Sequence, residues 1–225
     1  IGLLAHQHQI LFHVDAAQAV GKTEIDVHEM HIDLLSLSAH KIYGPKGIGA
    51  LYVRQGIQKQ IKTQIHGGGH EQGLRSGTLA THQIVGMGEA CRLAKINLVE
   101  EQQRIQKLRN QFLTSLQALT PVKLNGHPNK HVANYLNVSF LCEQANSILS
   151  AVKQVAAVSS GSACNSHHAT QSHVLNALGL NEELAAHTVR FSFGAYTTDE
   201  HIETILYKVQ FAINSKDFCV QLSAV

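Results

Sequence analysis

Two short apolar runs, each ending in polar side chains, constrain the fold of this chain more than any other feature. The first covers residues 10–14 and ends at Asp15, and the second covers residues 34–38 and continues into His40 and Lys41. Runs of this length and composition are typical of buried strands. Because α/β proteins bind ligands at the carboxyl ends of their strands, we expect these polar residues to belong to a site.

The rest of the chain alternates between helix and strand patterns. A turn at 44–47 leads into an expected strand at 48–53, and residues 83–119 indicate one or two long helices. Their buried face is expected to carry Ile105, Leu108, Phe112 and Leu116. Alternating residues predict strands at 134–140 and 188–193, with helices at 145–152 and after Thr198, and Asn181 is typical of a helix N-cap. We therefore predict an α/β fold, with a mainly parallel sheet in a domain at 1–95 and a smaller α+β domain at 96–225.

Bulk composition excludes some classes of protein. The chain has 225 residues, 44% hydrophobic and 15% charged, which is enough to bury a core. A formal net charge of +2 gives no reason to expect a nucleic acid or a membrane surface as partner. No apolar run is long enough to span a bilayer. The four cysteines lack the spacing of a disulfide framework or a zinc site, so we expect a reducing cytoplasm and no metal.

Asp15 has two interpretations. A carboxylate at the end of a buried strand needs a cationic or donating partner, and a pyridinium nitrogen kept protonated in this way becomes a good electron sink. Alternatively, Asp15 caps the turn that follows, and Gln18 and Lys22 are ordinary surface residues.

The segment Ser38-Ala39-His40-Lys41 offers an amine beside two phosphate ligands. Lys41 can form a Schiff base there, with Ser38 and His40 holding the phosphate. A solvated loop lysine is the alternative. Lys46 is a rival amine, although its place in a Gly-Pro turn suits a fixed Schiff base less well.

Two residues of the second domain are further candidates. Cys164 lies in a run of small residues, 159–166, where exposure favours thiolate chemistry, whereas most lone cysteines are small buried hydrophobes. Arg190, inside an alternating strand, can clamp a substrate carboxylate or form a structural ion pair. The histidines around Gly67–Gly69 and at 167–168 do not complete a metal site.

Five segments together closely resemble cysteine desulfurases of the NifS/IscS type, which are class-V aminotransferases with the pyridoxal-phosphate fold-type I. The segments are HVDAAQ at 13–18, SAHKIYGPKG at 38–47, GGGHE at 67–71, RSGT at 75–78 and SSGSAC at 159–164. The resemblance extends from the first residue to about residue 213. It implies that the first domain is the C-terminal portion of the cofactor-binding large domain.

The resemblance also implies a role for each residue that binds pyridoxal 5'-phosphate. Lys41 matches the Schiff-base lysine, which also acts as base. Asp15 matches the partner of the ring nitrogen, and Gln18 matches the partner of the ring hydroxyl. Ser38 and His40 match ligands of the phosphate.

Three further matches concern substrate and assembly. Thr78 matches a phosphate ligand that the other subunit supplies, which implies a homodimer. Cys164 matches the cysteine that becomes a persulfide. Arg190 matches the residue that binds the carboxylate of L-cysteine. The implied activity converts L-cysteine to L-alanine and passes sulfur to iron–sulfur scaffold proteins and tRNA-thiolation relays, without direct contact to nucleic acid or membrane.

The chain departs from this family at both ends. The family has a segment before the strand that ends at Asp15, and it supplies a ring-stacking histidine and further cofactor contacts. We therefore expect a partial large domain with exposed strand edges and little activity alone. The residues after Lys216 do not resemble the family's tail. The alternative functions are a selenocysteine lyase-like enzyme and a truncated non-catalytic subunit or fragment. The alternative to a cytoplasmic location is the mitochondrial matrix, if a targeting segment precedes Ile1.

Overall fold

The computed structural model describes residues 1–159 and 172–222, with side chains described to residue 215. The chain divides into two compact units, 1–100 and 101–225. Helix α2 (Thr81–Leu119) contains the division between them and continues through both. The boundary expected at 95/96 lies in the same helix, and the assignment of the two domains to parts of a cofactor enzyme stays a prediction.

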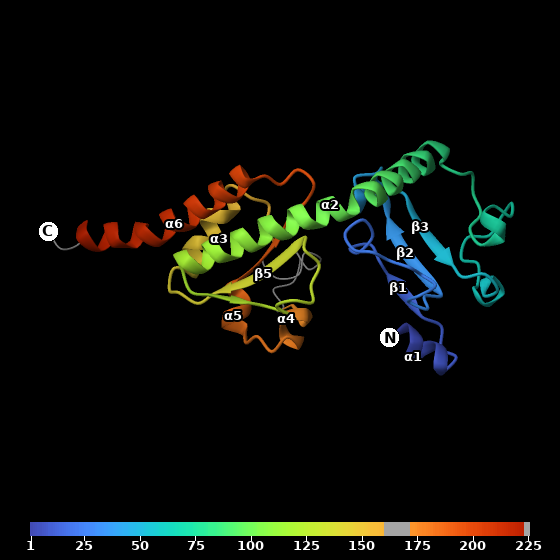
Figure 1. The fold of residues 1–225 in the computed structure, drawn as a ribbon, viewed down its shortest axis with the longest axis horizontal. Helices are drawn as coiled ribbons and strands as arrows, with labels where there is room; N and C mark the ends of the chain where they lie inside the picture. The colour runs from blue at the N-terminus through green and yellow to red at the C-terminus, as the bar shows by residue number, and fades with distance from the viewer. Residues whose placement is uncertain (160–171, 223–225) are drawn as a thin grey trace. The chain divides into compact units, whose positions relative to one another are not determined.

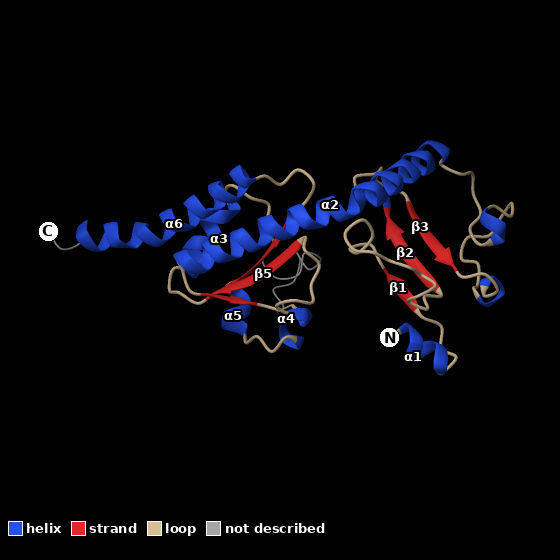
Figure 2. Ribbon diagram, in the orientation of Figure 1, coloured by secondary structure: helices blue, strands red, loops and turns tan. Residues whose placement is uncertain are grey.

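The first unit is built on a three-stranded mixed sheet (Figures 1 and 2). Its strands are β1 (His13–Asp15), β2 (Leu34–Ser38) and β3 (Gly49–Val53), in the order β1-β2-β3. β1 is parallel to β2, and β2 is antiparallel to β3, so one of the two strand pairs follows the parallel pattern expected. The remaining elements of the unit are α1 (Gly2–Gln7), η1 (Ala39–Ile42), η2 (Gln58–Gln60), η3 (Glu71–Gly73) and the first part of α2.

The prediction that the first apolar run forms a buried strand is wrong. The strand begins only at His13, and His13 and Asp15 are exposed while Val14 is half-buried. β1 lies at the edge of the described sheet, so no strand covers its outer side there. An apolar cluster of this unit is centred on the buried side chains of Ala16, Ile32 and Leu35.

The second unit is an antiparallel sheet covered by helices. Strands β4 (Val122–Leu124), β5 (Tyr135–Phe140) and β6 (Thr188–Ser192) pair in that order. The other elements are the second part of α2, α3 (Ala145–Lys153), α4 (His173–Ala177), α5 (Glu182–Ala186) and α6 (Asp199–Leu222). Asn181 caps α5 by accepting the backbone N–H of Leu184 at 2.9 Å, which confirms the predicted cap.

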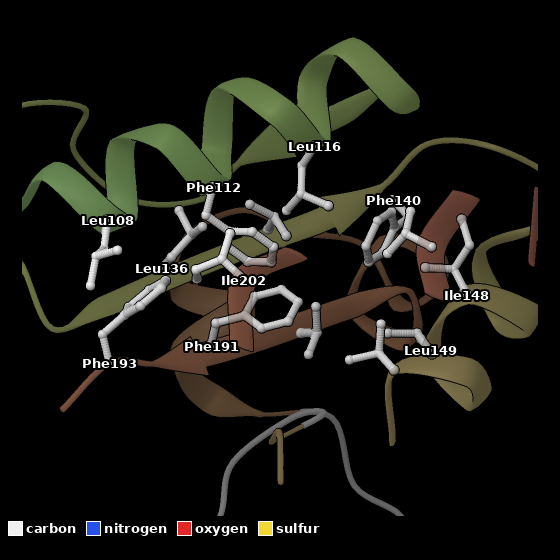
Figure 3. Packing of buried hydrophobic residues seen from close by; sticks show 14 of the residues in the cluster. Leu108, Phe112, Leu116, Leu136, Phe140, Ile148, Leu149, Phe191, Phe193 and Ile202 are labelled. Atoms are coloured by element: carbon white, nitrogen blue, oxygen red, sulfur yellow. The ribbon is translucent and has the colours of Figure 1, made fainter. Parts of the chain in front are cut away.

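A large apolar core holds the second unit together (Figure 3). The four positions predicted for the inner face of the long helix are all buried, as are the three inward residues of β5: Ile105, Leu108, Phe112, Leu116, Leu136, Val138 and Phe140. The ring of Phe112 packs edge-on against Phe191, with centroids 4.8 Å apart. The periodicity in the sequence therefore identified this core correctly. None of the helices in the described part of the chain combines the length and apolar character needed to cross a membrane.

Candidate functional site

The first group of candidate residues lies where β1 and β2 end side by side. The parallel register aligns Asp15 with Ser36, and the N–H of Ala16 donates to the Ser36 carbonyl at 2.8 Å. Ser38 follows two residues after Ser36 on β2. Asp15 and Ser38 therefore both lie at the carboxyl ends of the two parallel strands. An Oδ1 of Asp15 accepts the N–H of Ala17 at 3.0 Å, and the carboxylate stays exposed. Asp15 thus orders the following turn and is also accessible to a ligand.

A half-buried lysine lies in the turn after β1. The ammonium of Lys22 donates to Oε1 of Gln18 at 3.0 Å. Burial, and to a smaller extent the positive charge of Lys41, lowers the pKa of Lys22 from 10.5 to about 8. Sequence reasoning treated Lys22 as a surface residue; its spacing of four from Gln18 was the signal that could have linked them.

The short helix η1 presents its two polar residues outward. Ala39 and Ile42 are buried, whereas His40 and Lys41 are exposed. Tyr43 ends the helix with a φ of 65°, and the N–H of Gly44 returns to the Ala39 carbonyl at 2.9 Å. The backbone is therefore fixed on both sides of Lys41, while the described residues do not desolvate its amine.

The turn that carries Lys46 is held against α2. Nε2 of Gln83 donates to the Lys46 carbonyl at 2.8 Å, and a Cβ on Gly86 would lie 2.7 Å from Cγ of Pro45. This close approach needs the glycine. The side chain of Lys46 is exposed. Both lysines thus lie on ordered backbone, and Lys41 directly follows Ser38 and His40 in the chain.

The glycine-rich loop is ordered by its own polar groups. The N–H of Gly69 donates to Oγ of Ser76 at 3.3 Å, and that of Gly77 donates to Nδ1 of His70 at 3.4 Å. The ring of His70 therefore accepts a hydrogen bond from the backbone. Thr78, which follows this loop, is exposed. Among the residues with described positions, no group of three metal-ligating side chains comes together.

In the second unit, Arg190 lies on β6, and one atom of its guanidinium group has no partner among the described residues. Its Nε is buried and makes no hydrogen bond to any described residue. No carboxylate within 1–159 or 172–215 forms an ion pair with it either, so the structural ion pair weighed from the sequence is absent from those ranges. The Nε of Arg190 is therefore a donor for which a carboxylate from a ligand is a suitable acceptor.

The backbone of Arg190 is bonded to the start of the cysteine-bearing segment. Its N–H donates to the Ser159 carbonyl at 2.9 Å, and its carbonyl accepts the N–H of Ser159 at 3.3 Å. Cys164 itself, like the His167-His168 pair, lies outside the described residues. The structure thus fixes where this segment begins, beside β6.

The side chains at the end of β1 and β2 fit a phosphorylated pyridine aldehyde. They comprise a carboxylate for a ring nitrogen, an amide for a ring oxygen, a hydroxyl and an imidazole for a phosphate, and an amine for the aldehyde: Asp15, Gln18, Ser38, His40 and Lys41. Each group is of the type that such a cofactor needs.

Comparison with known proteins agrees with this chemistry. A family model described as aminotransferase class-V matches residues 1–205. A cysteine desulfurase IscS of Acinetobacter baumannii (strain AYE) is 60% identical over 206 residues, which cover 92% of this chain and 51% of that protein. A cysteine desulfurase IscS of Tolumonas auensis is 56% identical over 90% of this chain and 50% of that protein.

Solved structures give the same result. A NifS-like protein from Rickettsia africae superposes with a TM-score of 0.82 at 28% identity, over 95% of this chain and 56% of that one. A structure described as SspA in complex with cysteine superposes with a TM-score of 0.73 at 39% identity, over 88% of this chain and 54% of that one. The chain spans about half the length of the curated relatives it matches.

Proposed function

Since the chain belongs to the aminotransferase class-V family, whose members depend on pyridoxal phosphate, we propose that it carries the cofactor-lysine and reactive-cysteine portion of a cysteine desulfurase. The observation that carries the proposal is the parallel register of β1 and β2, because it puts Asp15 and the start of the Ser38–Lys41 segment at the same, carboxyl, end of the two strands. Identity of 60% to a cysteine desulfurase over 92% of the chain supports the choice of reaction.

Five residues would hold the cofactor. Asp15 would keep the ring nitrogen protonated, Gln18 would donate to the ring oxygen, Ser38 and His40 would bind the phosphate, and Lys41 would bind the aldehyde group. The chemistry that the bound cofactor would supply is an electron sink for the negative charge left when the substrate loses its α-proton. Thr78 is proposed to reach the phosphate of a partner subunit, which makes the active assembly a homodimer.

Three side chains act on the substrate. Arg190 would bind the carboxylate of L-cysteine with its planar guanidinium, and the amine of Lys41 would take up the α-proton. The thiolate of Cys164 attacks the substrate sulfur. L-cysteine and the Cys164 thiol become L-alanine and a Cys164 persulfide, so every atom is accounted for. Iron–sulfur scaffold proteins and tRNA-thiolation relays in the cytoplasm are the proposed sulfur acceptors.

The exposed edge of β1 favours a second candidate function. A sheet edge with unpaired backbone groups is a surface that another strand can cover. The chain would then be a non-catalytic subunit, or would act only together with further polypeptide. A measurable cysteine turnover by this chain alone would reject that candidate.

The first experiment titrates the purified chain with pyridoxal phosphate and records the visible absorption spectrum. We expect a new band that Lys41→Ala lacks and that Lys46→Ala, the matched control on the neighbouring turn, retains. A band that depends on Lys46 instead, or on neither lysine, contradicts the assignment of Lys41.

The second experiment measures both the band and the transfer of sulfur from L-cysteine. Cys164→Ala is expected to retain the band and to transfer no sulfur; unchanged sulfur transfer would reject the role of Cys164.

A further inference from the structure

One face of the second sheet carries a row of polar side chains that ends at Arg190. Asn137 on β5 pairs with Arg190 on β6, and Asn125, which directly follows β4, donates its N–H to the Asn137 carbonyl at 2.9 Å. The neighbouring residues Leu136 and Phe191 point into the core, so Asn137 and Arg190 point to the opposite face (Figure 3). Directly opposite residues have Cβ atoms about 4.5–5.5 Å apart, so these two side chains are neighbours.

A relay of hydrogen bonds, which starts at a backbone carbonyl, fixes how the Asn137 amide is turned. The hydroxyl of Thr188 donates its single proton to the Leu184 carbonyl at 2.6 Å, so the 2.6 Å contact between the Thr188 and Ser139 hydroxyls uses the proton of Ser139. Ser139 therefore accepts from Asn125, whose Nδ2 donates to Oγ of Ser139 and to Oδ1 of Asn137, both at 2.8 Å. The Nδ2 group of Asn137 is thus the end of its amide that is left for another acceptor.

The opposite orientation of the Asn125 amide conflicts with this relay. Its oxygen would then face Ser139, which has no second proton to donate. The relay itself does not maximise stability, because Oδ1 of Asn125 is buried without a donor among the described residues. What the relay does achieve is a fixed direction for the donor group of Asn137.

Two neighbouring donors therefore lack an acceptor in the described part of the chain. Nε of Arg190 is buried without a partner there, and the side chain of Asn137 is engaged there through Oδ1. No carboxylate within 1–159 or 172–215 forms an ion pair with Arg190. A carboxylate has two oxygens, and one such group on a ligand satisfies a charged donor and a neutral donor side by side.

We propose that Asn137 is a substrate-binding residue whose Nδ2 donates to the same carboxylate as the guanidinium of Arg190. The inference rests on the proposed function, which assigns this carboxylate to L-cysteine. Arg190 supplies the charge, and Asn137 supplies a second donor whose direction the sheet fixes, so together they set the orientation of the carboxylate. Because Ser159 pairs with Arg190 on the other side of β6, the carboxylate would lie beside the start of the segment that contains Cys164.

The first test uses acetate as the probe and the purified chain without cofactor. In ¹⁵N-labelled protein, the side-chain amide of Asn137 and the Nε of Arg190 are expected to shift together along one saturation curve. Acetamide, which has the same shape without the charge, should shift neither resonance at the same concentration. An Asn137 amide resonance that does not respond to acetate overturns the proposal.

The second test replaces the donor of Asn137 and keeps its acceptor. Asn137→Asp retains the oxygen that accepts from Asn125, so the relay and the fold should persist, which thermal unfolding checks. The new carboxylate repels that of the substrate and pairs with Arg190 instead. We expect the preference for L-cysteine over its methyl ester, measured by calorimetric titration in the presence of pyridoxal phosphate, to fall by about tenfold or more.

Asn146→Asp is the matched control, since it makes the same change of charge at an exposed position on α3 and should keep the preference. An unchanged preference in Asn137→Asp overturns the proposal. A wild type that does not distinguish the acid from the ester rejects the proposed role of Arg190, which is a separate failure. The response of Asn137 to acetate then decides by itself whether this amide faces a carboxylate.

Discussion

Arg190 and Ser159 are joined by two backbone hydrogen bonds, 2.9 Å and 3.3 Å long, across an antiparallel bridge. Arg190 belongs to β6, and Ser159 is the last described residue before the segment that contains Cys164. The proposed carboxylate-binding residue and the base of the proposed persulfide segment are therefore attached to each other by the main chain. A substitution of the Arg190 side chain leaves this attachment intact, so the two roles can be tested separately.

Removal of the Arg190 guanidinium is expected to abolish recognition of the substrate carboxylate. Charge-assisted hydrogen bonds contribute about 1.5–3 kcal/mol, so Arg190→Ala should weaken L-cysteine binding by about ten- to a hundredfold. Arg190→Lys keeps the charge but not the planar fork, and an intermediate loss is expected. Calorimetric titration with L-cysteine and with its methyl ester checks this. The preference for the acid should disappear in Arg190→Ala and remain in Ser192→Ala, at the exposed end of the same strand; an unaltered preference in Arg190→Ala contradicts the role.

Arg104 ties the loop after β6 to α2. Its guanidinium donates to the carbonyls of Thr197 at 2.7 Å, Ala195 at 3.0 Å and Gly194 at 3.1 Å, and it pairs with Glu101 through two bonds of 2.9 Å. Arg104→Ala leaves several acceptors unsatisfied and should destabilise the second unit by about 1–3 kcal/mol. Urea unfolding followed by circular dichroism measures this loss.

A matched control exists on the same helix. Arg92 and Glu89 form the same i, i+3 pair, but both side chains are exposed, and Arg92 bonds no loop carbonyl within the described part of the chain. Arg92→Ala is expected to leave the unfolding midpoint unchanged, because exposed pairs contribute little. Equal effects of the two substitutions would mean that the loop contacts of Arg104 contribute nothing.

His131 is expected to make the second unit sensitive to mild acid. Burial, followed by the nearby cation of Arg109, lowers the pKa of His131 below its usual 6.5. The unfolded chain therefore binds more protons in this range than the folded chain does. The stability that depends on neutral His131 is fully present above pH 6.5 and is lost as the pH falls through the lower folded pKa. Urea unfolding between pH 7.5 and about 5 should show a steeper loss for wild type than for His131→Leu; parallel curves would rule out this contribution.

The sequence predicted what depends on local pattern and missed what depends on neighbours. The predictions of the buried face of α2 around Phe112 and of the inward residues of β5 were correct. The spacing of apolar residues in the sequence matches the buried positions when one face of an element packs on a core. The apolar run before Asp15 looked like a buried strand, yet burial also requires a covering strand, which the described sheet lacks. Lys22 was passed over because its pKa is lowered by burial and by the charge of Lys41, a residue about twenty positions later along the chain.

Phe112 is expected to be the most sensitive apolar position of the second unit. It is fully buried, and its ring meets Phe191 edge-on at 4.8 Å and Phe193 at 6.0 Å. Phe112→Ala removes these contacts and leaves a cavity between α2 and the sheet, at a cost of about 3–5 kcal/mol. Phe211→Ala is the matched control, since that ring on α6 is 59% exposed and its loss should change stability by less than about 0.5 kcal/mol. Thermal unfolding of both variants distinguishes them, and a similar drop for the two would mean that the core does not depend on the packing around Phe112.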